Sequence, residues 1–187
     1  GAASVLLRKK PARVEVYNDI DGDVVNLFRV LRSDDAGRLI EALRLTPFAR
    51  DEYDAAFAHT GDPVERARRL VVRSGMGIGI RSVHGKKSGF AHRKLRDNGQ
   101  CDALEWATQP IRLSAIAARL RPLDTNNAVI IENKPAGDVL ERYDCEGTLF
   151  YLDPPYVMDA RASGAVYRNE MNDGAHRDLL ARLPQLA

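Results

Sequence analysis

The chain has 187 residues, of which 44% are hydrophobic and 29% are charged, and its formal net charge is +2. This length and composition fit one globular domain with a sizeable core, and they exclude a disordered or fibrous chain. No apolar run approaches the length of a membrane span, so we expect no membrane partner. Cys101 and Cys145 have neither metal nor redox spacing and the histidines are scattered. We therefore expect a reducing cytoplasm and no metal site.

Hydrophobic periodicity predicts strands that alternate with helices along the chain. In chain order we expect a helix over 2–7, a strand over 14–17, a helix capped by Asp21 or Asp23, helices over 35–43, from Asp62 and from Pro110, a strand over 129–131, a helix over 139–143, a strand over 148–152 and a helix over 174–183. This alternation predicts an α/β fold with a parallel sheet. Residues 33–123 interrupt the sheet with an insertion that is mostly helix and loop.

The middle of the chain is basic. Residues 59–100 contain ten Lys and Arg against three acidic residues, a local net charge of +7 that leaves −5 for the remainder. Residues 74–100 also lose their periodicity and contain six glycines. A loop of that length inside a domain is usually functional or disordered. A basic middle in an acidic frame indicates a polyanionic partner.

The most informative segment is Asp153-Pro154-Pro155-Tyr156, which follows an apolar and aromatic run over 148–152. That run predicts a buried strand, and ligands of open α/β sheets bind at the carboxyl ends of strands. The ionised Asp153 carboxylate only accepts hydrogen bonds. Pro155 stiffens the corner and favours a Pro154 backbone that turns its carbonyl into the site, and Tyr156 adds a flat ring for stacking.

These groups together suit an amino group on a planar ring. Two acceptors beside an aromatic plate would localise the amine's lone pair, so that the nitrogen could attack a positively charged methyl donor. The plain alternative for these four residues is a turn that ends a strand, since Asp-Pro is common in turns.

Four stretches of the sequence together resemble the adenine-specific DNA methyltransferases of the Dam type, particularly phage and prophage members. Residues 1–7 (Gly-Ala-Ala-Ser-Val-Leu-Leu) are similar to the end of the glycine-rich loop that holds S-adenosylmethionine, and 16–23 are similar to the acidic loop after the second strand. The basic segment over 74–92 occupies the place of the target-recognition segment, and 153–156 resembles the catalytic motif. The resemblance covers nearly the whole chain, and the stretches come in the family's order.

The resemblance implies a fold and a reaction. We expect a Rossmann-like methyltransferase sheet, incomplete and divided between residues 1–32 and 124–187, with a mostly helical target-recognition insertion over 33–123. The implied reaction moves a methyl group from S-adenosylmethionine to the exocyclic N6 amine of an adenine flipped out of double-stranded DNA. We expect a monomer in the cytoplasm of a bacterium or a phage-infected cell.

The resemblance also assigns residues. The catalytic group is Asp153, Pro154, Pro155 and Tyr156; the cofactor group is Gly1, Ala2, Ala3, Asp19, Ile20 and Asp153; the DNA-binding candidates are Arg73, Lys86, Lys87, Arg93 and Lys94. Asp19 would bind the ribose hydroxyls and Ile20 would pack on the adenine of the cofactor. The spacing agrees, because an acid about twenty residues after a loop that opens a helix is typical of nucleoside binding.

Other functions stay open. A related methyltransferase could act on RNA or on a protein glutamine, although those relatives generally begin the motif with Asn. The family's strand order would place the strand over 148–152 between two strands that the sequence lacks. We therefore expect a fragment of an active enzyme that is itself weakly active, or a catalytically inactive fragment that only binds DNA.

Overall fold

Helices account for most of the computed structural model, which describes residues 3–92, 101–121, 127–161, 164 and 166–186. The elements are α1 (Ser4–Arg8), β1 (Val14–Asn18), α2 (Gly22–Arg32), α3 (Ala36–Leu45), α4 (Arg50–Ala55), α5 (Pro63–Met76), α6 (Asp102–Ala107), α7 (Gln109–Leu120), β2 (Ala128–Glu132), α8 (Ala136–Tyr143) and α9 (Asp173–Arg182). Single 3₁₀ turns lie at η1 (Ile80–Ser82), η2 (Met158–Ala160) and η3 (Leu183–Gln185).

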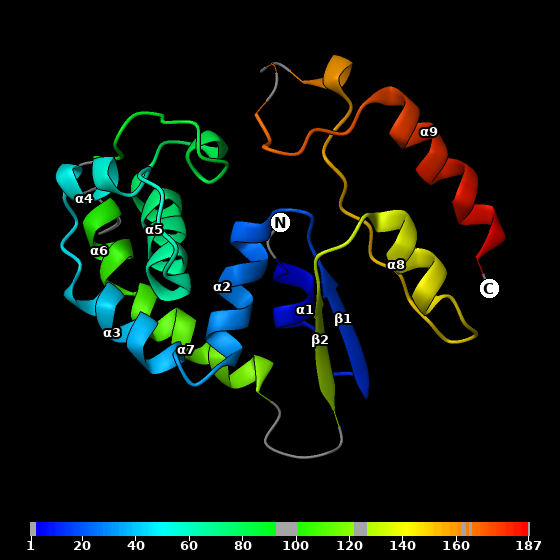
Figure 1. Ribbon diagram of the computed structural model, residues 1–187, viewed down its shortest axis with the longest axis horizontal. Helices are drawn as coiled ribbons and strands as arrows, with labels where there is room; N and C mark the ends of the chain where they lie inside the picture. Colours follow the sequence, from blue (N-terminus) through cyan, green and yellow to red (C-terminus); the bar gives the residue numbers. More distant parts are fainter. Residues whose placement is uncertain (1–2, 93–100, 122–126, 162–163, 165, 187) are drawn as a thin grey trace.

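The two strands pair in parallel, with Val14 opposite Ala128 and Asn18 opposite Glu132. This pairing confirms that strands distant in sequence form a parallel sheet. The helices from α2 to α7 lie on one side of the strands, and α8 and α9 lie on the other (Figure 1). Because parallel strands run in the same direction, Asn18 and Glu132 end at the same edge of the sheet.

The hydrophobic core lies among the helices on the α2 side. α2 packs chiefly against α5, and α7 packs against both α2 and α3. The core contains Phe28 and Leu31 of α2 together with Leu70 of α5, and Val129 of β2 joins the same cluster. The predicted insertion over 33–123 therefore shares one continuous core with the first 32 residues.

Local signals predicted several helices correctly. The Asp21 carboxylate caps α2 by accepting a 2.9 Å hydrogen bond from the Asp23 amide, and Asp62 caps α5 by accepting a 2.9 Å bond from the Val64 amide. Such caps satisfy amides at the helix start that have no partner inside the helix. The expected helices over 35–43, 139–143 and 174–183 are present as α3, α8 and α9. The short helices α4 and α6 were not predicted.

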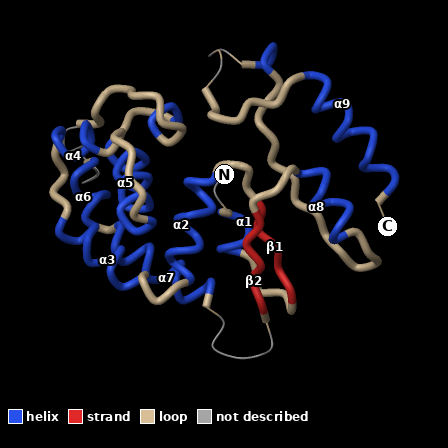
Figure 2. Tube along the Cα trace, in the orientation of Figure 1, coloured by secondary structure: helices blue, strands red, loops and turns tan. Residues whose placement is uncertain are grey.

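The prediction of a buried strand over 148–152 is wrong. This segment is extended but belongs to no strand (Figure 2), and the Leu149 side chain is 92% exposed. Tyr151 is also largely exposed. An apolar segment is buried as a strand only when neighbouring strands lie on both sides of it. No strand in the described part of the chain pairs with residues 148–152.

The basic segment after α5 is folded back on the helices as far as it is described. Gly77 and Phe90 form an antiparallel bridge that closes its base. The hydroxyl of Tyr53, which is 1% exposed, lies 2.8 Å from Ser82 Oγ and donates a 3.0 Å hydrogen bond to the Ser88 carbonyl. The expected glycine-rich loop over 74–100 therefore begins after α5 ends at Met76, and 93–100 lie outside the described residues.

Candidate active site

The carboxyl ends of β1 and β2 are joined by side chains. Asn18 Nδ2 donates to the Lys134 carbonyl and the Lys134 amide donates to Asn18 Oδ1, both at 3.0 Å. Asn133 Nδ2 donates a 2.7 Å bond to the Asp19 carbonyl. The side-chain amide of Asn133 and the backbone of Lys134 therefore hold the loop that carries Asp19.

Asp19 lies directly after β1, as the cofactor prediction requires. Its Oδ1 accepts a 2.8 Å bond from the Asp21 amide and its Oδ2 a 3.0 Å bond from the Tyr17 hydroxyl. Burial of the Tyr17 ring, with the Asp19 carboxylate as the next cause, raises the pKa of that hydroxyl. Each carboxylate oxygen has two lone pairs, so both retain acceptor capacity for a ligand hydroxyl. Ile20 follows with an exposed side chain.

The residue before α1 has a strained backbone. Ala3 adopts a left-handed conformation, with φ of 62° and ψ of 18°, immediately before α1. Residues with a Cβ rarely adopt this conformation, and strained backbone concentrates at functional sites. Gly1 and Ala2, the other residues predicted to hold the cofactor loop, lie outside the described residues.

The Asp153–Tyr156 corner is on the surface. The Tyr156 ring is 69% exposed, Asp153 is exposed, and Pro154 and Pro155 are half-buried. His176 Nε2 lies 2.8 Å from the Pro155 carbonyl, and Arg161 Nε donates a 2.6 Å bond to the Tyr156 carbonyl. The Pro154 carbonyl accepts no hydrogen bond from the residues that the structure describes.

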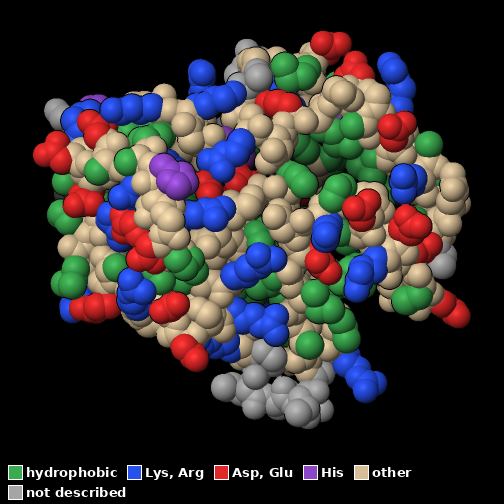
Figure 3. Space-filling model, viewed as in Figure 1, with side chains coloured by type: hydrophobic (Ala, Val, Ile, Leu, Met, Phe, Trp, Pro, Cys, Tyr) green, Lys and Arg blue, Asp and Glu red, His purple; other side chains and the backbone are tan. Residues whose placement is uncertain are grey.

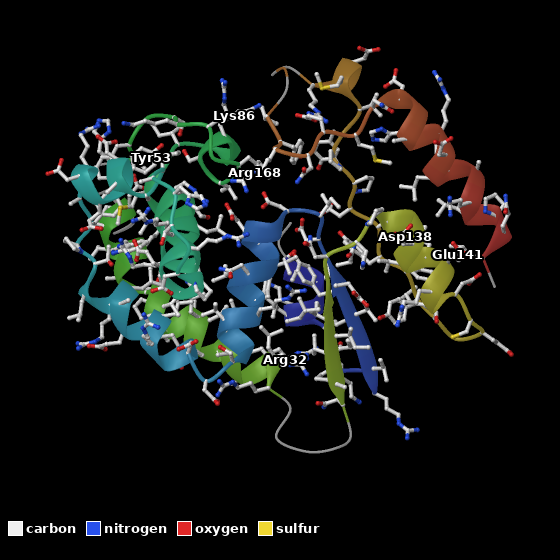
Figure 4. All side chains as sticks on the ribbon, viewed as in Figure 1. Arg32, Tyr53, Lys86, Asp138, Glu141 and Arg168 are labelled. Atoms are coloured by element: carbon white, nitrogen blue, oxygen red, sulfur yellow. The ribbon has the colours of Figure 1, made fainter. Side chains whose placement is uncertain are left out.

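A charged cluster links this region to the start of α2. Asp23 accepts bonds from Arg66 Nε at 2.6 Å, Arg73 Nη2 at 3.1 Å and Arg168 Nη1 at 2.8 Å. Arg168 Nη1 also lies 3.2 Å from Asp21 Oδ1. Figure 4 shows the Arg168 side chain reaching from the C-terminal part of the chain toward α2. The segment after the Asp153–Tyr156 corner is therefore tied beside the acidic loop.

The carboxylates of this cluster stay ionised. Burial alone would raise the pKa of Asp23, but hydrogen bonds from Arg66 and Arg168 outweigh it and lower that pKa below its ordinary value. At Asp21 burial is likewise outweighed, by the His84 ring 3.6 Å away, the Asp23 amide and the Arg168 charge. Opposite charges nearby favour the charged form of a carboxyl group.

Among the predicted DNA-binding residues that the structure describes, Lys86 and Lys87 are exposed and Arg73 is buried. Arg73 is 7% exposed and donates to Asp23 and to the Ala56 carbonyl, so its predicted phosphate contact is wrong for this conformation. It falls on the face of α5 that packs toward α2. Lys86 and Lys87 are exposed on the loop after η1, and Lys87 pairs with Asp54 at 2.8 Å. Arg93 and Lys94 lie outside the described residues.

The visible surface shows no single field of charge. In Figure 3, Lys and Arg side chains are interspersed with Asp and Glu, and hydrophobic side chains are visible on the half that carries α8 and α9. Among the described residues, no cluster of three or more His, Cys, Asp or Glu could hold a metal ion. None of the described helices has both the length and the apolar character to cross a membrane.

Two open hollows lie on the surface near the sheet. One of about 350 Å³ is lined by Arg29, Arg32, Ser33 and Ile131. The other, of about 300 Å³, lies at the carboxyl end of β2 and along α8, and is lined by Glu132, Lys134, Asp138, Val139, Glu141 and Arg142. Figure 4 labels two of the residues that line this second hollow, Asp138 and Glu141, on α8. The Asp153–Tyr156 corner lines neither of them.

Sequence reasoning missed the residues that contact the motif's backbone. His176 and Arg161 were not singled out because no spacing rule connects them to the Pro155 and Tyr156 carbonyls. Arg168 was also missed, although Asp21 and Asp23, its partners, were expected near the start of α2. The chain matches no protein-family model, and comparisons with curated proteins and with solved structures gave no match.

Proposed function

We propose that the chain carries the catalytic and DNA-binding residues of a site-specific DNA adenine methyltransferase that uses S-adenosylmethionine. The observation that carries the proposal is the exposed Asp153–Tyr156 corner, with its carboxylate, its Pro154 carbonyl without a described donor and its accessible Tyr156 ring. Together they provide two acceptors and a stacking surface for the amino group of a nucleobase.

The cofactor residues fit a nucleoside. Asp19 at the end of β1 has acceptor capacity for two ribose hydroxyls, and the exposed Ile20 side chain offers an apolar surface for the adenine ring. The left-handed Ala3 would lie in the loop that approaches the donor. When bound, S-adenosylmethionine would supply a methyl group from its positively charged sulfur. The sulfur would keep the electron pair of the broken carbon–sulfur bond. The amine nitrogen would gain the methyl group and release a proton to water.

The motif residues would act on the adenine. Asp153 and the Pro154 carbonyl would accept the two hydrogens of the exocyclic amine and localise its lone pair. The base must first leave the duplex, which costs a few kcal/mol, and stacking on Tyr156 would return roughly 1–3 kcal/mol. Lys86 and Lys87, exposed on the loop after η1, are the described candidates for contacts with DNA phosphates, and Arg93 and Lys94 remain predicted candidates.

One observation favours the non-catalytic alternative. The segment over 148–152 that leads into the motif pairs with no described strand, and Leu149, Tyr151 and Leu152 are exposed, so no sheet fixes the position of Asp153. A chain in this state would bind DNA and transfer methyl groups slowly or not at all. Measuring methyl transfer and DNA binding on the same chain separates the catalytic function from the non-catalytic one.

The test is methyl transfer from a radiolabelled donor to DNA of mixed sequence, with modified bases located by sequencing. We expect N6-methyladenine with the wild-type chain and none with Asp153→Ala. Donor binding, measured by calorimetry, should stay largely intact in this variant, because Asp153 is one member of a cofactor group that also includes Asp19 and Ile20. Glu146→Gln, an exposed acidic residue seven positions earlier, is the matched control and should keep wild-type activity. Methylation by Asp153→Ala at the wild-type rate would remove Asp153 from the mechanism. DNA binding without any methylation would favour the alternative.

A further inference from the structure

Two backbone carbonyls of the catalytic motif are held by side chains from the segment that follows it. We propose that His176 and Arg161 are positioning residues, which fasten the Pro155 and Tyr156 carbonyls and leave the Pro154 carbonyl as the motif's backbone acceptor for the substrate amine. This inference rests on the proposed function.

His176 lies in the first turn of α9 and faces the motif. Its Nε2 is 2.8 Å from the Pro155 carbonyl, and its Nδ1 is 3.0 Å from the Asn172 carbonyl. Carbonyl oxygens only accept and a neutral imidazole has one N–H, so only one of these two ring contacts is a hydrogen bond. The Asn172 carbonyl already accepts the backbone amide of His176 at 3.0 Å, and we assign the ring hydrogen to Nε2, which then donates to the Pro155 carbonyl. Asn172 caps α9 by accepting a 2.8 Å bond from the Ala175 amide, which fixes the helix turn that presents His176.

Arg161 holds the next carbonyl. Its Nε donates a 2.6 Å bond to the Tyr156 carbonyl, and its Nη2 contacts the same oxygen. The third nitrogen, Nη1, donates a 2.8 Å bond to Glu170, and the Arg161 side chain is only 5% exposed. The guanidinium also lies 4.9 Å from the centre of the Tyr167 ring. A planar guanidinium with this many fixed partners has one available orientation.

Glu170 fixes Arg161 in turn. Its Oε1 accepts bonds from the amides of Val166 at 2.8 Å and Tyr167 at 2.9 Å, while its Oε2 accepts from Arg161. Arg161 and the Val166–Glu170 segment are thus joined by one ion pair, in which the Arg161 side chain is 5% exposed and the Glu170 side chain 25% exposed. Both peptide planes that follow Pro155 are held, so hydrogen bonds fix the backbone of Tyr156 and the direction of its Cα–Cβ bond.

These contacts are not part of the hydrophobic core. α9 contributes no buried side chain, and the core lies among α2, α3, α5 and α7. Loss of either donor should therefore leave the fold intact and change only the placement of the motif. Misplacement of a reacting group by about 1 Å can cost about 100-fold in rate.

The first measurement does not depend on activity. Hydrogen exchange followed by mass spectrometry would compare the peptide over 156–161 in the wild-type chain and in His176→Leu and Arg161→Met. We expect the amide of residue 161, which donates to the Met158 carbonyl at 3.1 Å, to exchange about five- to tenfold faster or more in both variants, because loss of the side-chain hydrogen bonds destabilises the folded segment that protects it. His176→Gln keeps a donor and should restore slow exchange, and the matched surface variant His59→Leu should exchange like wild type. Unchanged exchange in both His176→Leu and Arg161→Met would overturn the inference.

The second measurement is the methyl-transfer rate of the same variants. We expect kcat to fall about 10- to 100-fold in His176→Leu and Arg161→Met, with the KM for the donor unchanged, and to recover in His176→Gln. Wild-type kcat in both variants would refute the positioning role while the proposed function stands. If the wild-type chain itself fails to methylate DNA, the proposed function fails, and faster exchange in the variants would still support the fastening of the two carbonyls.

Discussion

Removal of the Asp23 carboxylate should destabilise the chain strongly, because it leaves a buried arginine without its charged partner. Asp23 accepts a 3.1 Å bond from Arg73, whose side chain is 8% exposed. Breaking a buried pair by deleting one partner typically costs about 3–5 kcal/mol. Arg66 and Arg168, the other donors to Asp23, are partly exposed, so each adds less than about 1 kcal/mol.

The expected cost of Asp23→Ala is therefore near the lower limit of that range, since Arg73 keeps its 2.9 Å bond to the Ala56 carbonyl. About 3 kcal/mol corresponds to a decrease in the melting temperature of roughly 6–12 °C for a domain of this size. The sole tryptophan, Trp106, is buried and donates a 2.9 Å bond to the Thr46 carbonyl, so its fluorescence reports unfolding of the helical core. Urea titration at neutral pH gives the free energy of unfolding.

A double variant tests the cause. Asp23→Ala combined with Arg73→Met removes the stranded charge, so it should recover most of the stability lost in Asp23→Ala alone. Glu41→Gln, which breaks an exposed pair with Arg44, should leave the urea midpoint unchanged. If Asp23→Ala behaves like this surface control, or if the double variant is no more stable than the single one, the reasoning about the buried charge is wrong.

Other predictions use the same urea titration. In Gly77→Ala the added Cβ would lie 2.3 Å from Ser82 Oγ, so we expect the free energy of unfolding to fall by more than about 2 kcal/mol. In Gly37→Ala, in α3, the added Cβ meets open space, so we expect the free energy of unfolding to rise by about 0.5–1 kcal/mol. Tyr53→Phe removes the buried hydroxyl and should cost about 1–3 kcal/mol. Because the pKa of Asp21 is lowered in the folded chain, its stabilising contribution should be complete above about pH 4 and lost as the pH falls through that lowered pKa. Equal midpoints for the two glycine variants, a neutral Tyr53→Phe, or an Asp21→Asn variant as acid-sensitive as wild type would each contradict the corresponding prediction.

Signals within one or two turns of chain were enough to predict the helix starts. Asp21 and Asp62 cap α2 and α5 because a carboxylate two residues before an amide can accept its hydrogen whatever the rest of the fold does. The strands over 14–17 and 129–131 were also predicted, since both are apolar runs between turn residues. Their parallel pairing followed from the helices between them.

Features that depend on distant partners were not predictable in this way. The run over 148–152 has the composition of a buried strand, but burial requires neighbours that its own sequence does not contain. The charge of the Arg73 side chain predicted an exposed position. Its burial is possible because the carboxylate of Asp23, fifty positions earlier in the chain, accepts a hydrogen bond from it. His176 lies 21 positions from Pro155, and no periodicity relates the two.

The C-terminal part of the chain is held by polar contacts rather than by buried apolar area. Among the described residues after α8, Val166 is the only one that belongs to the buried set. Regions with few buried apolar contacts exchange and open at a free energy well below that of global unfolding. Local opening of this part would thus break a few hydrogen bonds while the helices from α2 to α7 stay folded. A large planar ligand would then have room beside Tyr156 without global unfolding of the protein.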